Sequence, residues 1–100
     1  MKKHILTTPK KAELWRRQDI TINEVTYTMF LYTWGNYNGF VHLAHLYKDF
    51  EHIASAKAQY YNRTWEYFTG ESVYKEACNF AILSKDITKE IKQAIMECLK

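Results

Sequence analysis

Cysteine, proline and glycine are all scarce in this chain. It has two cysteines, one proline and three glycines among 100 residues. Cys78 and Cys98 do not form a closely spaced pair, so neither belongs to a metal-binding or redox motif of the usual kind. Both fall on expected apolar helix faces, where a free cysteine behaves as a small hydrophobic residue.

Long hydrophobic runs and catalytic motifs are also missing. No segment approaches the length of a membrane span, and Lys2 and Lys3 are not followed by the apolar stretch of a signal peptide. The sequence contains no glycine-rich phosphate loop, nucleophile elbow or zinc-protease motif. We therefore expect a cytoplasmic protein with no membrane partner, no cofactor and no enzymatic activity.

The composition is that of one globular domain with many aromatic residues. Hydrophobic residues make up 47% and charged residues 25%, which is ordinary for a folded chain of this length. Aromatic residues make up 16%, and eight of them are tyrosines. Such rings suit a binding interface, but they also suit a small sheet that needs bulky side chains to fill its core.

Positive charge is concentrated at the N-terminus. Residues 1–18 hold six basic residues against one acidic residue, whereas the rest of the chain is slightly acidic. Thr8 and Pro9 are a typical helix start, which predicts a short basic helix over residues 10–17. We therefore divide the chain into a basic N-terminal arm over residues 1–18 and a single α+β domain over residues 19–100.

A period of two begins near Asp19 and predicts a hairpin with a tight turn at Asn23-Glu24. One face receives Ile20, Ile22, Val25, Tyr27, Met29 and Leu31, and the other receives Thr26, Thr28, Phe30, Tyr32 and Trp34. β-branched and aromatic residues at this spacing are typical of a strand. We expect the long strand to be central, with one face on helices and the other partly covered or offered to a partner.

Residues 40–61 fit two interpretations. Their apolar spacing and alanines favour a helix, while residues 40–47 and 51–61 also fit two strands joined by a turn at Lys48-Asp49. After Gly70 the spacing is helical, with Thr69 or Ser72 as the first cap and with a second helix beginning near Ser84 or Asp86.

A motif of the form YYNRTWExF occupies residues 60–68, followed by Glu71-Ser72-Val73 and preceded at a distance by Trp34-Gly35-Asn36. It resembles a segment of small uncharacterised proteins of phages, plasmids and related bacterial mobile elements. The resemblance implies strands for residues 40–61. It also implies a setting in which small proteins block host machinery, an anti-CRISPR role being the most concrete example.

We therefore predict an α+β fold: a four-stranded antiparallel sheet with a short N-terminal helix and two C-terminal helices packed mainly on one face. The leading functional hypothesis is a noncatalytic module that binds a host protein. Its contact residues would be Tyr60, Tyr61, Arg63, Trp65 and Tyr67, all of the types that dominate binding hot spots. The same rings could instead close the end of the sheet as part of the core.

The alternative hypothesis is a small nucleic-acid-binding regulator, in which sheet aromatics stack bases and basic residues meet phosphates. Its residues would be Lys10, Lys11, Arg16, Arg17, Tyr32, Trp34 and Tyr37, with Tyr47 beside them. A second copy of the chain is a further possible partner, because exposed aromatic residues are compatible with a homodimer interface. A metal site at His42, His45 and His52 is not expected, because residues 42 and 45 of a strand point to opposite faces, and on a helix residue 52 lies away from the side that those two share.

Overall fold

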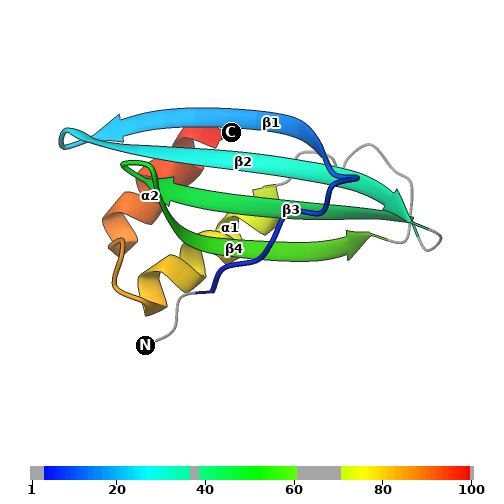
Figure 1. Ribbon diagram of the computed structural model, residues 1–100. Helices are drawn as coiled ribbons and strands as arrows, with labels where there is room; N and C mark the ends of the chain where they lie inside the picture. The colour runs from blue at the N-terminus through cyan, green and yellow to red at the C-terminus, as the bar shows by residue number, and fades with distance from the viewer. Residues whose placement is uncertain (1–3, 37–38, 61–70, 100) are drawn as a thin grey trace.

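The computed structural model describes residues 4–36, 39–60 and 71–99. Four strands are followed by two helices in this part of the chain (Figure 1). The elements are β1 (Glu13–Ile22), β2 (Val25–Asn36), β3 (Gly39–Lys48), β4 (Glu51–Tyr60), α1 (Glu71–Leu83) and α2 (Lys89–Leu99). The expected α+β class is confirmed, as are the four-stranded antiparallel sheet and the two helices packed on it.

The strands form a meander, because their order in the sheet is their order in the chain and all neighbours are antiparallel. Two tight turns lie at one end of the sheet. Asn23 and Glu24 have φ angles of 52° and 67°, and Asp49 and Phe50 have φ angles of 46° and 71°. Positive φ at both central residues matches the twist of antiparallel hairpins. The first turn is where the sequence predicts it, and the second lies one residue later than expected.

The face of the sheet that carries the helices holds the core. Tyr27, Met29 and Leu31 of β2 are at most 3% exposed, which confirms the face expected for them. On β4, alternating alanines leave room for α1, so that small residues of the strand meet larger ones of the helix. The core residues on these two elements are Ile53, Ala54 and Ala56 of β4 and Val73, Tyr74, Ala77, Cys78 and Ala81 of α1.

The predicted N-terminal helix is wrong. Residues 4–18, all described, contain no helix; Ala12 donates its N–H to the carbonyl of Pro9 in a turn, and β1 begins at Glu13. The strand pairs with β2 from Glu13 to Ile22, with a bulge at Trp15. A full ladder of main-chain hydrogen bonds to β2 satisfies this backbone, and such tertiary pairing overrides local helix propensity.

The helix caps also differ from expectation. α2 begins at Lys89, and the Thr88 hydroxyl oxygen accepts the N–H of Ile91 at 3.2 Å, so Thr88 is its N-cap. Ser84 instead follows the end of α1, where its hydroxyl lies 2.8 Å from a carboxylate oxygen of Asp86. At the other end of α1, Ser72 lies inside the first turn, and Thr69 is outside the described residues.

Candidate binding surface

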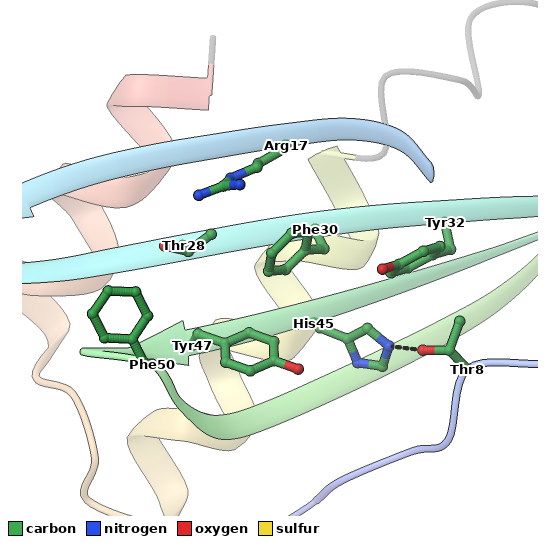
Figure 2. Close-up of a pocket in the computed structure, with 8 residues that line it drawn as sticks. All are labelled: Thr8, Arg17, Thr28, Phe30, Tyr32, His45, Tyr47 and Phe50. Carbon is green, nitrogen blue, oxygen red and sulfur yellow. Dashed lines mark hydrogen bonds between the residues drawn. The ribbon is translucent and has the colours of Figure 1, made fainter. Parts of the chain in front are cut away.

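The sheet face opposite the helices carries a hollow of about 250 Å³ (Figure 2). We call it the aromatic hollow. It is lined by Thr8, Arg17, Thr28, Phe30, Tyr32, His45, Tyr47 and Phe50. These residues come from the N-terminal segment, the first three strands and the turn after β3. Those on the strands share one face of the sheet, because alternate residues of neighbouring antiparallel strands point to the same side. Side chains distant in the sequence therefore meet in one place.

Aromatic rings form the body of the hollow. Phe30 meets the ring of Tyr47 edge to face, with centroids 5.4 Å apart, and lies 6.4 Å from the ring of Tyr32. The Arg17 guanidinium lies over Phe30, 5.5 Å from the ring centre, and also contacts Asp19 at 3.4 Å. The side chain of Arg17 is 56% exposed, so it holds a positive charge at the rim while one side rests on a ring.

Phe50 stands at the edge of the hollow in an unusual state. It is 92% exposed and has a positive φ of 71°, in the second turn. A left-handed conformation costs a residue with a side chain roughly 1–2 kcal/mol, and an exposed ring gains nothing from the core. Stability of the isolated chain does not explain a phenylalanine here. Exposed, strained positions of this kind are typical of functional surfaces.

A buried polar network forms the floor. His45 Nδ1 lies 3.1 Å from His52 Nε2 and 2.8 Å from Ser55 Oγ, and His45 Nε2 lies 2.7 Å from Thr8 Oγ1. Burial, and secondly the charge of His52, lowers the pKa of His45 to about 4. His45 is therefore neutral at pH 7, so one of its ring nitrogens acts as a hydrogen-bond donor and the other as an acceptor. Ser55 is fully buried, so its hydroxyl serves this network and is not accessible to a substrate.

The N-terminal segment crosses the free edge of β4 onto this face, and we call residues 4–12 the strap (Figure 1). The ring of His4 stacks on Phe80 of α1 with centroids 3.8 Å apart, and its carbonyl accepts the N–H of Ser55 at 2.7 Å. The contact between Thr8 and His45 then fixes the strap beside the hollow. The strap thus joins the helix layer to the open face and forms one wall of the aromatic hollow.

The residues of the leading hypothesis lie mostly outside the described part of the chain. Tyr61, Arg63, Trp65 and Tyr67 fall in the undescribed range 61–70, and only the backbone of Tyr60, the last residue of β4, is described.

The residues of the alternative hypothesis lie in different parts of the fold. Tyr32 and Arg17 line the aromatic hollow, whereas Lys11 and Trp34 line a second hollow near the other end of the sheet. Arg16 lies on the helix side, with its guanidinium 3.4 Å from the carbonyl oxygen of Leu99. Two further residues complete the set: Lys10 is exposed, and Tyr37 is outside the described residues.

Sequence reasoning missed five residues of this surface, namely Thr8, Thr28, Phe30, His45 and Phe50. Phe30 was assigned to the correct face by its alternation with Tyr32 and Trp34 but was not included as a site residue. Phe50 fits the helical spacing of residues 40–61 but has no place in the strand alternation, because it lies in a turn, and its exposure follows only from the position of that turn.

Among the described residues, no group of three or more histidine, cysteine or acidic side chains could hold a metal ion. The register of β3 places His42 on the helix face and His45 on the open face. Both cysteines are free thiols, with Cys78 buried. Neither helix in the described ranges is long and apolar enough to cross a membrane.

No protein-family model, curated protein or solved structure matches this chain.

Proposed function

We propose that this protein is a noncatalytic binding module whose contact surface for a protein partner is the aromatic hollow, including Phe50 at its edge. The observation that carries this proposal is the 92% exposed ring of Phe50, held in a strained turn beside partly buried rings. Burying such a ring in a partner stabilises a complex by roughly 2–3 kcal/mol. Aromatic residues and arginine are also the types that dominate protein interfaces, and Arg17 lies at the rim.

The setting of this proposal comes from the resemblance to mobile-element proteins. There the partner would be a component of host defence, and the protein an inhibitor of the anti-CRISPR kind acting in the cytoplasm. The segment with Tyr60, Tyr61, Arg63, Trp65 and Tyr67 remains a second candidate contact region. Phage plating on cells that express the protein tests the setting: restored plating is expected for at least one defence system, and unchanged interference across a panel rejects it.

Single-stranded nucleic acid is the second candidate partner. Phe30 and Tyr32 are successive same-face residues of one strand, with ring centroids 6.4 Å apart, and Arg17 lies beside them. Rings in a row stack neighbouring bases, and a cation at their edge meets the phosphates. Against this, Asp19 lies 3.4 Å from Arg17 and offsets part of its charge.

Affinity capture from a bacterial lysate distinguishes the two candidate partners. The wild type and surface variants are each used as bait, with and without nuclease treatment. We expect a protein that resists nuclease treatment and is lost with Phe50→Ser or Tyr47→Ala. Leu83→Ser is the matched control, because Leu83 is an exposed apolar residue of α1, which packs on the other side of the sheet. Capture that survives both hollow variants but fails with Trp65→Ala would move the contact surface to residues 60–67. Material recovered only without nuclease would favour nucleic acid.

A further inference from the structure

The two edges of the sheet differ in what covers their main-chain groups. At the β4 edge, the strap supplies a carbonyl to the N–H of Ser55. At the β1 edge, the strand pairs with β2 and with no other strand of the described residues. An edge strand whose main-chain groups point outward is a template for pairing with another chain.

The hairpin register fixes which main-chain groups of β1 point outward. Ile22 and Val25 flank a two-residue turn, so they form a hydrogen-bonded pair, and every second residue back along β1 also bonds to β2. The residues between them turn their N–H and C=O groups to the free edge. These are Arg17, Asp19 and Thr21, in a stretch beyond the bulge at Trp15 where the ladder is regular.

Charge decides among the ways in which two such edges can pair. Antiparallel pairing must match outward-facing residues with outward-facing residues. A register centred on Arg17 or on Asp19 sets that residue against its own copy, and like charges directly opposite each other are destabilising. A register centred on Gln18 instead sets Arg17 against Asp19 of the second copy, and does so twice. Registers nearer the turn overlap fewer residues and pair neither charge.

We propose that two copies of this chain pair through their β1 edges in the antiparallel register centred on Gln18. Arg17 and Asp19 lie on the same face with side chains 56% and 50% exposed, 3.4 Å apart within one chain. In the pair, the four side chains alternate in sign, so that each charge has opposite charges both along and across the strands. The exposed rim residues Leu14 and Trp15, 51% and 47% exposed, come to lie beside the turn-proximal end of the other β1.

Charges and bulges on an edge strand usually prevent pairing, since they penalise most registers. Here the bulge at Trp15 limits regular pairing in the proposed register to residues 16–20, and among the antiparallel registers of β1 this one sets the two opposite charges against each other. The two sheets then form one continuous sheet, with both helix layers on one side and both aromatic hollows on the other.

Charge reversal with rescue tests the pairing on the full chain. Sedimentation velocity across a range of micromolar concentrations should show a monomer–dimer equilibrium. Arg17→Asp and Asp19→Arg should each weaken the dimer about tenfold or more, because each sets like charges together at two places. The double variant Arg17→Asp with Asp19→Arg restores both pairs and should restore the dimer. Lys75→Asp, an exposed charge reversal on α1, is the control and should change nothing.

A cross-link checks the register itself. Gln18 meets its own copy as a non-hydrogen-bonded pair, whose Cα atoms in such sheets lie about 4.5 Å apart, within reach of a disulfide. In a Cys98→Ser background, Gln18→Cys should form a covalent dimer on mild oxidation and Thr21→Cys should not. A wild-type chain that stays monomeric throughout, or a dimer indifferent to either single charge reversal, overturns the proposal.

Discussion

Acidification should destabilise this protein through one histidine on the open face. His45 is 3% exposed, and its pKa is lowered to about 4 in the fold from an ordinary 6.5. The unfolded chain therefore takes up the proton more readily than the folded chain. It follows that the stabilisation is fully present above pH 6.5 and is lost as the pH falls towards 4.

The size of the effect follows from the two pKa values. Between pH 7.5 and pH 5, preferential protonation of the unfolded chain at this residue removes about 2 kcal/mol from the free energy of unfolding. For a domain of this size, a loss of that order lowers the melting temperature by roughly 10 °C. Burial also lowers the pKa of His42, which adds to the loss in the same direction.

The comparison with His45→Gln isolates this contribution. Urea unfolding followed by circular dichroism at pH 7.5 and pH 5 gives one stability difference for each protein. His42 and the carboxyl groups contribute to both differences and cancel, so the wild type should lose about 2 kcal/mol more than the variant. An equal loss in the two proteins would show that His45 titrates normally and would refute the reasoning.

Two further substitutions should raise stability. Phe50→Gly relieves the positive φ of an exposed turn residue and should increase the free energy of unfolding by about 0.5–1 kcal/mol in urea melts; a decrease would mean that the ring stabilises the fold. Tyr74→Phe removes a buried hydroxyl that has no hydrogen-bond partner in the described part of the chain, and should add about 1 kcal/mol in the same assay. A loss of about 1 kcal/mol would instead show that this hydroxyl is satisfied in solution.

Strand alternation was the most reliable sequence signal. The face of β2 that holds Met29 and Leu31 could be predicted because each side chain's environment repeats every second residue. In β4 the signal was ambiguous, because alanine favours helices in isolation. There Ala54 and Ala56 face the helix layer, where their small size lets α1 approach the sheet.

The N-terminal region could not be predicted from local sequence. Thr8 and Pro9 are a good helix start, but residues 13–22 gain a ladder of hydrogen bonds with β2 that no local pattern reports. The same limit applies to the candidate site. The contact between Thr8 and His45 joins residues 37 positions apart, and only the path of the strap brings them together.

The meander has a kinetic consequence. Each strand pairs with the next one along the chain and is separated from it by only two residues, so the sheet assembles from local contacts that close small loops. The strap is the exception, since His4 must find both Ser55 and Phe80 across long stretches of chain. We expect the sheet to form rapidly and the strap to dock last. During refolding, the buried histidine network should therefore become protected from solvent in a late phase, after most of the strand signal has appeared.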